Sequence, residues 1–269
     1  KSKFEMSFMG ELSFFLGLQV QQTERAGTPI VVNHKLGPDL DMEDADQKEY
    51  RSMIGSLMYL TASRPDILFA VSICSRYQAH PKISHLKAVK RIFCYLKGKP
   101  SLGLWYSNDD DFSLSAFSDS DYGGCNMSWK STTGGCQFLG NRLVSWQCKK
   151  QTTVSTSTAE AEYIAAASCC SQVLWIQHQL RDYGLLYTQT PVHIDNTAAI
   201  SIIRNPVQHS KTKHIEIRYH FIRDCYEKKL INLIRIDTLK QNADIFTKAF
   251  SKARFEELIS MIGMQTLDH

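Results

Sequence analysis

The sequence predicts a mixed α/β fold, in which helices pack on a sheet that contains both parallel and antiparallel strands. Two observations support this. Beyond residue 112, short runs rich in β-branched and aromatic residues alternate with segments of helical period, in the order βββαβα(α)βα. The first three of these runs are joined by short turns, which is typical of an antiparallel meander. At 269 residues and 43% hydrophobic residues, the chain can bury a sizeable core in one or two domains.

The first part of the chain, residues 1–99, reads as a separate α+β segment. Apolar runs on either side of a turn-prone Arg25-Ala26-Gly27 predict a β-hairpin, and an acidic irregular stretch after it predicts an exposed loop. Apolar residues at helical spacing then predict helices, the second of them capped by Asp66. The predicted elements are a hairpin over 13–20 and 29–32, a loop over 36–49, and helices over 50–64, 66–80 and 84–98.

A polar break at residues 100–112 is the predicted domain boundary, so a second domain spans 113–263. A turn at Gly140-Asn141-Arg142 separates two of its strands, and Thr158 is the predicted cap of its longest helix. The predicted strands cover 114–119, 135–139, 143–147, 192–195 and 230–236, and the predicted helices cover 158–183, 197–204, 211–229 and 242–261.

Composition excludes several classes of protein. No run of about 18 apolar residues is present, which argues against a membrane span. The eight cysteines form no Cys-x-x-Cys pair and lie mostly in apolar runs, as expected for reduced thiols in an intracellular protein. The net charge is only +4, but the third predicted helix is strongly basic. We expect it to bind a phosphate backbone, against the alternative of a solvated helix face, through Lys87, Lys90, Arg91 and Lys97.

Four acidic residues, Asp119, Glu162, Asp195 and Asp244, lie at the edges of predicted strands and helices. Carboxylates that converge on one point repel one another unless cations neutralise them. Two Mg²⁺ ions would do so, and they suit phosphodiester hydrolysis. Each acid has an alternative interpretation. Asp195 and Asp244 could cap helices, Asp121 competes with Asp119, and Glu160 competes with Glu162 because the two lie about 200° apart on a helix.

Residues 113–250 contain five motifs that match a known family. They are Phe117-Ser118-Asp119-Ser120-Asp121, Thr158-Ala159-Glu160-Ala161-Glu162-Tyr163, Asp195-Asn196, Lys213-His214-Ile215-Glu216-Ile217-Arg218-Tyr219-His220-Phe221 and Ala243-Asp244-Ile245-Phe246-Thr247-Lys248. With these motifs the segment resembles the ribonuclease H domain of copia-type LTR retrotransposon polyproteins. Upstream, the words Gly10–Gly17 and Ser63–Ile67 resemble the C-terminal part of the reverse transcriptase of the same elements. The resemblance implies a ribonuclease H-like fold preceded by a truncated reverse transcriptase segment.

The same resemblance implies an activity, the endonucleolytic hydrolysis of the RNA strand in an RNA–DNA hybrid. Its D-E-D-D pattern falls on Asp119, Glu162, Asp195 and Asp244, holding two Mg²⁺ ions for which Mn²⁺ substitutes, with Asp119 bridging them. We expect further contacts to the hybrid, including its 2′-hydroxyls, from Ser120, Asn196 and the basic 204–218 segment with Lys211 and Lys213. The implied partner is the rest of the Pol polyprotein, and the implied location is intracellular, in cytoplasmic particles and also the nucleus.

Two departures from the family pattern matter for function. No Tyr-x-Asp-Asp polymerase motif occurs, so we expect no DNA synthesis from this chain. The loop before Asp244 also lacks the histidine that many related nucleases carry, and His209, His214 and His220 are the alternatives. The competing function is a catalytically inactive, nucleic-acid-binding remnant of a retrotransposon polyprotein.

Overall fold

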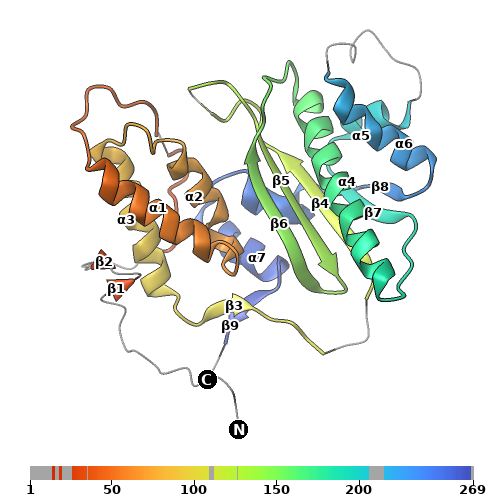
Figure 1. Cartoon of the computed structure of the whole chain (residues 1–269), viewed down its shortest axis with the longest axis horizontal. Coiled ribbons are helices and arrows are strands. Elements are labelled where there is room, and N and C mark those ends of the chain that lie inside the picture. Colours follow the sequence, from red (N-terminus) through yellow and green to blue (C-terminus); the bar gives the residue numbers. More distant parts are fainter. Residues whose placement is uncertain are drawn as a thin grey trace.

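A five-stranded mixed sheet forms the centre of the part of the chain that the structure describes (Figure 1). The structure is a computed structural model, and it describes residues 14–15, 18–19, 26–34, 36–108, 112–125, 127–205 and 215–267. The strands are β4 (Leu114–Ser120), β5 (Thr132–Leu139), β6 (Arg142–Lys150), β7 (Thr190–Ile194) and β8 (Ile231–Arg235), in the order β6-β5-β4-β7-β8. The first three are antiparallel, and β7 and β8 run parallel to β4, which confirms the predicted mixed sheet.

Helices cover both faces of this sheet (Figure 1). On one face lie α4 (Thr158–Asp182), α5 (Thr197–Arg204), the short helix η3 (Ile217–His220) and α6 (Phe221–Glu227). On the other face lie α1 (Gln47–Leu60), η1 (Pro65–Ile67), α2 (Leu68–Ser75), α3 (Ile83–Gly98), η5 (Asn242–Phe246) and α7 (Lys252–Met261). Alternate residues of β4 enter the two cores, with Ala116 in the first and Phe117 against the second, as the period of a strand requires.

The N-terminal helices share one apolar core with the sheet. Tyr50 and Ile92 belong to the same buried cluster as Phe138 of β5 and Phe255 of α7. A hydrogen bond of 3.0 Å from the indole of Trp146 on β6 to the carbonyl of Thr61 joins the two parts as well. The described residues before and after the predicted boundary at 100–112 therefore share one core, and a division into independently folding domains stays a prediction.

The predicted N-terminal hairpin is wrong in its pairing. Strand β1 (Phe14–Phe15) pairs with β2 (Leu18–Gln19), both inside the first predicted strand, and residues 29–32 form no strand. There the Thr28 hydroxyl donates to the carbonyl of Ile30, and Ile30 is buried in the core. A side chain that bonds its own backbone in this way competes with a strand ladder.

Helix caps differ from those predicted at two positions. Ser157, and not Thr158, caps α4, because its hydroxyl accepts the N–H of Glu160. Asp66 caps no helix and instead lies buried within η1. Its carboxylate accepts two hydrogen bonds from the guanidinium of Arg64, at 2.9 and 2.7 Å, and one from the hydroxyl of Tyr95, at 2.7 Å. The predicted start of the first helix at Tyr50 is also late, since Asp46 caps α1.

The C-terminal elements depend on contacts between distant parts of the chain. The helix predicted over 242–261 is divided into η5 and α7, and the one predicted over 211–229 is represented by η3 and α6, its residues 211–214 lying outside the described ones. Inside the predicted linker, β3 (Leu102–Leu104) pairs with β9 (Met264–Thr266). None of the eight cysteines forms a disulfide. Among the described residues, no helix has the length and apolar character needed to cross a membrane.

We predict that Asp66→Ala lowers the free energy of unfolding by about 3–5 kcal/mol, because it leaves the buried guanidinium of Arg64 without its counter-charge. Urea unfolding of the purified chain measures this. Asp224→Ala is the matched control, since it removes only an exposed ion pair with Lys228 on the surface of α6 and should change stability little. Equal effects of the two variants would contradict the prediction.

A second prediction concerns the close approach of η5 to β5. A Cβ atom at Gly134 would lie 2.5 Å from Cγ2 of Thr247 and 2.9 Å from the carbonyl oxygen of Ala243. Gly134→Ala should therefore destabilise the protein by about 1–3 kcal/mol through overpacking. Gly55→Ala, in the middle of α1 with nothing near its Cβ position, should stabilise it by about 0.5–1 kcal/mol. Chemical denaturation distinguishes the two, and a Gly134→Ala protein as stable as the parent would refute the packing argument.

Candidate active site

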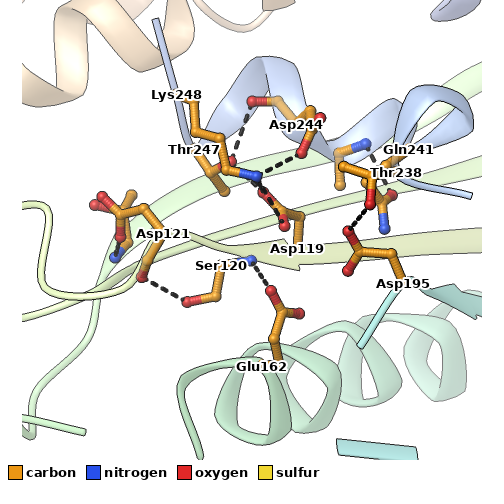
Figure 2. Close-up of polar contacts among 12 residues, drawn as sticks. Asp119, Ser120, Asp121, Glu162, Asp195, Thr238, Gln241, Asp244, Thr247 and Lys248 are labelled. Carbon is orange, nitrogen blue, oxygen red and sulfur yellow. Dashed lines mark hydrogen bonds and ion pairs between the residues drawn. The ribbon is translucent and has the colours of Figure 1, made fainter. Parts of the chain in front are cut away.

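Asp119 lies at the centre of an acidic cluster at the carboxyl end of β4 (Figure 2). Strand β4 is the middle strand of the sheet, and the Asp119 side chain is only 2% exposed. The hydroxyl of Thr247 donates a hydrogen bond to its Oδ2 atom. The ammonium of Lys248 lies 3.2 Å from Oδ2 and 3.4 Å from Oδ1. A buried carboxylate is thus compensated by one neutral donor and one cation.

Glu162 approaches Asp119 from the first turns of α4. Its Oε1 atom accepts the backbone N–H of Ser120 at 3.0 Å, which ties the helix to the end of β4. Its Oε2 atom is buried and has no hydrogen-bond partner among the residues that the structure describes. Burial raises the pKa of Glu162 well above its usual value, and the charges of Asp119 and Asp195 raise it further. An unpartnered carboxylate oxygen in such a place is unfavourable unless a cation meets it.

Glu160, the competing residue, has a different role. Its Oε2 atom accepts the backbone N–H and the hydroxyl of Thr156, each at 2.7 Å. It therefore fixes the chain that enters α4, together with the Ser157 cap. The structure brings Glu162, and not Glu160, to the acidic cluster.

Asp195 follows β7, the strand parallel to β4. The helix after it is capped by its neighbour Asn196, whose side-chain oxygen accepts the N–H of Ala199 at 3.0 Å. Asp195 is therefore not needed as a cap. Its Oδ2 atom accepts a hydrogen bond of 3.0 Å from the hydroxyl of Thr238, which belongs to the short helix η4 (Thr238–Lys240). One carboxylate oxygen from each of Asp119, Glu162 and Asp195 lies within 4.8 Å of the other two.

Asp244 lies in η5 on the other side of Asp119 (Figure 2). Helix η5 is held against β4 by Gln241, whose side-chain amide donates to the carbonyl of Ser118 at 2.9 Å. The Oδ1 atom of Asp244 lies 2.8 Å from the ammonium of Lys248. Burial and then the charge of Asp119 raise the pKa of Asp244 to about 7, against the opposing effect of Lys248.

Asp121 does not belong to the cluster, and Figure 2 shows its side chain away from Asp119. Its Oδ1 atom accepts the backbone N–H of Thr132 at the start of β5. Burial raises its pKa to about 6, while that hydrogen bond and the charge of Arg76 lower it. Asp121 thus ties the start of the connection after β4 to the start of β5.

The cluster fits a hard divalent cation. Such ions prefer carboxylate oxygens, and Asp119, Glu162 and Asp195 offer three of them at one point. The Oε2 atom of Glu162 supplies an independent observation, since this buried carboxylate oxygen meets no hydrogen-bond donor of the described residues. Asp244 adds a fourth carboxylate, which Lys248 holds.

The residues expected to bind nucleic acid lie in several environments. Lys87 and Lys90 are exposed on α3, whereas Lys97 is partly buried there and the guanidinium of Arg91 donates to the Thr28 hydroxyl at 3.1 Å. The helix packs on α1 and α2, and α2 makes the contact with β6 and η5. The Ser120 hydroxyl, beside the cluster, donates to the carbonyl of Asp121 at 3.0 Å, and Asn196 is a helix cap. Lys211 and Lys213 lie outside the described residues.

Sequence reasoning missed the residues that hold the acids in place. Thr247 and Lys248 follow Asp244 by three and four positions, so one helical turn brings all three side chains to the same side. The spacing of these three residues within the motif at 243–248 could have identified Thr247 and Lys248 from the sequence. No comparable spacing in the sequence pointed to Thr238 or Gln241. Among the candidate histidines, His220 bonds the Tyr163 hydroxyl at 2.8 Å and is packed, and His209 and His214 lie outside the described residues.

Comparison with known proteins gives relatives over most of the chain. The "Retrovirus-related Pol polyprotein from transposon RE1" of Arabidopsis thaliana is 39% identical over 238 residues, 88% of this chain and 16% of that protein. The corresponding protein from transposon TNT 1-94 of Nicotiana tabacum is 33% identical over 254 residues, 92% and 19% of the two chains. The "Uncharacterized mitochondrial protein AtMg00810" of Arabidopsis thaliana is 34% identical over 199 residues, 65% and 82%.

No family model matches the chain. Among solved structures, LC11-RNase H1 is similar over 55% of this chain and 96% of its own, with 12% identity and a TM-score of 0.40. The mixed sheet itself, and not this likeness, establishes the α/β fold class. The chain spans less than a fifth of the length of each of these transposon Pol polyproteins. On the identity shared with them over most of its residues, the chain belongs to the family of retrovirus-related Pol polyproteins from copia-type transposons.

Proposed function

We propose that this chain is a ribonuclease H, a divalent-metal-dependent endonuclease that hydrolyses the RNA strand of an RNA–DNA hybrid. The observation that carries the proposal is that Glu162, which has a buried oxygen without a partner among the described residues, lies in one group of carboxylates with Asp119 and Asp195. A cluster of this kind costs free energy in a protein without a cation, and divalent cations bound by carboxylates promote attack on phosphodiesters. The four-acid order Asp, Glu, Asp, Asp supports the same activity.

The chain's own residues would hold and orient the acids. Strand β4 fixes Asp119 between two neighbouring strands, and the N–H of Ser120 fixes one oxygen of Glu162 so that the other stays available. The Thr238 hydroxyl orients Asp195, and Thr247 orients Asp119. Preorganisation of this kind, by backbone and hydroxyl donors on rigid elements, lets a site bind ions without rearranging during the reaction.

Asp119, Glu162, Asp195 and Asp244 would hold up to two Mg²⁺ ions, and Mn²⁺ would substitute. When bound, such ions supply an activated water and neutralise charge on the leaving oxygen of the phosphodiester. Asp119 is the residue suited to contact both, because it lies between Glu162 and Asp195 on one side and Asp244 on the other (Figure 2).

The proposed substrate and partner follow from the family. The relatives are Pol polyproteins, and this chain covers only part of them, so we propose that it acts together with the rest of such a polyprotein. Discrimination between RNA and DNA would come from contacts to 2′-hydroxyl groups, with Ser120, Asn196 and the 204–218 segment as the proposed contributors. The exposed Lys87 and Lys90 of α3 would add contacts to phosphates that are independent of sequence.

The proposal predicts cleavage of a strand-labelled RNA–DNA hybrid by the purified chain in Mg²⁺ and none in EDTA. Asp195→Asn should reduce the rate by at least about a hundredfold, because it removes a charged metal ligand. Gel analysis of both labelled strands measures this, with Asp121→Asn as a variant of a nearby acid outside the cluster. Hybrid binding without any metal-dependent product would instead identify a nucleic-acid-binding remnant.

The two glutamates of α4 provide a sharper comparison. Glu162→Gln should abolish cleavage while leaving the protein at least as stable as the parent in EDTA, since it removes a buried, unpartnered charge. Glu160→Gln should retain cleavage but lower the melting temperature, since it weakens the two bonds to Thr156. Thermal unfolding and cleavage assays on both variants test this. Loss of activity only in Glu160→Gln would reverse the assignment.

A further inference from the structure

The cluster contains two unlike positions for a cation, one on each side of Asp119. The first lies among Asp119, Glu162 and Asp195, where Oε2 of Glu162 has no partner. The second lies between Asp119 and Asp244, and there the ammonium of Lys248 is already in contact with both carboxylates, at 3.2 and 2.8 Å (Figure 2). The protein thus supplies a cation of its own on one side and leaves the other open.

The backbone delivers Lys248 to this position. Its N–H donates to the carbonyl of Asp244 at 3.1 Å, so that the lysine and the aspartate stand one helical turn apart at the end of η5. Thr247 bonds Asp119 from the same turn. The side chain of Lys248 is 38% exposed, whereas those of Asp119 and Asp244 are 2% and 4% exposed. The ammonium can therefore leave toward solvent, and the two carboxylates cannot.

We propose that Lys248 is an internal cation that occupies the second metal position, so that a second ion binds between Asp119 and Asp244 only by displacing its ammonium. This inference rests on the proposed metal-dependent function and concerns its ions. A divalent ion carries two positive charges and the ammonium carries one, so the two carboxylates can favour the ion and exchange is feasible. The exchange must first break the two charge-assisted hydrogen bonds of Lys248. Lys248 is in this sense a positioning residue for the acids, and not one that touches substrate.

Two consequences follow for the wild-type chain. The first ion, at Asp119, Glu162 and Asp195, binds without displacing any protein cation, and the second binds more weakly because Lys248 competes with it. In the metal-free protein, Lys248 stabilises the two buried carboxylates, which would otherwise repel one another.

Isothermal titration of the full chain with Mn²⁺ tests the inference. We expect one tight ion and a second at least tenfold weaker in the wild type. Lys248→Met should tighten the second ion at least tenfold, with little change in the first, and should lower the melting temperature in EDTA. Lys248→Arg keeps the charge and should keep the second ion weak. Lys228→Met removes an exposed lysine directly after α6 and serves as the matched control. Unchanged or weaker binding of the second ion to Lys248→Met overturns the inference.

A second measurement uses the wild-type chain and so does not depend on how the variants fold. Reductive methylation with formaldehyde and borohydride, read by peptide mass spectrometry, reports how available the Lys248 amine is. Its rate should rise several-fold in saturating Mn²⁺ relative to EDTA, because the displaced side chain enters solvent, while the rate at Lys228 stays constant. Equal rates at Lys248 in the two conditions overturn the inference.

The inference and the proposed function fail separately. If Lys248 exchanges with Mn²⁺ but no hybrid is cut, the exchange stands and the nuclease does not. If hybrid is cut in a metal-dependent way while Lys248→Met leaves the second ion unchanged, the nuclease stands and the exchange does not.

Discussion

Mutual repulsion among buried carboxylates is the constraint on which the rest of this structure depends. Asp119, Glu162 and Asp244 are all removed from water, and Asp195 lies beside them. Like charges at such distances are tolerated only where donors or cations compensate them. The protein supplies an ammonium from Lys248 and a hydroxyl from Thr247 to Asp119, and a backbone N–H to Glu162. One oxygen of Glu162 stays uncompensated, and this incomplete compensation is what makes the cluster a candidate centre for ions.

In this fold, neighbouring residues cap the helices and hold the turns, so that the acids of the cluster are not used for these purposes. Helix α4 is capped by Ser157, so that Glu162 is not used at its start, and α5 is capped by Asn196, so that Asp195 is not used either. Asp121 fixes the turn after β4, which leaves Asp119 to face η5. In each pair of neighbouring polar residues, one stabilises a local element, and the other reaches the cluster.

The N-terminal helices contribute to the same arrangement from the other face of the sheet. Their core is continuous with that of β5, β6 and α7, and η5 belongs to it through Ile245 and Phe246. The helix that carries Asp244 and its lysine therefore lies between the sheet and α2. Close approach of η5 to β5 requires the absence of a side chain at Gly134.

The sequence by itself determined the mixed α/β class and most strands and helices beyond residue 112, because strand period and helix period are local signals. It also singled out four acids as candidates, through the motifs that resemble the family. It left open whether Glu160 or Glu162, and whether Asp119 or Asp121, reaches the cluster. Both members of each pair are acidic and stand two residues apart, in or directly after the same element. Tertiary structure decided these choices, because each depends on which residue meets a partner far along the chain, as Glu162 meets Ser120 and Asp121 meets Thr132. The pairing of β3 with β9, the buried Asp66 and the insertion of Lys248 between Asp119 and Asp244 likewise arise from long-range packing, which a local pattern does not encode.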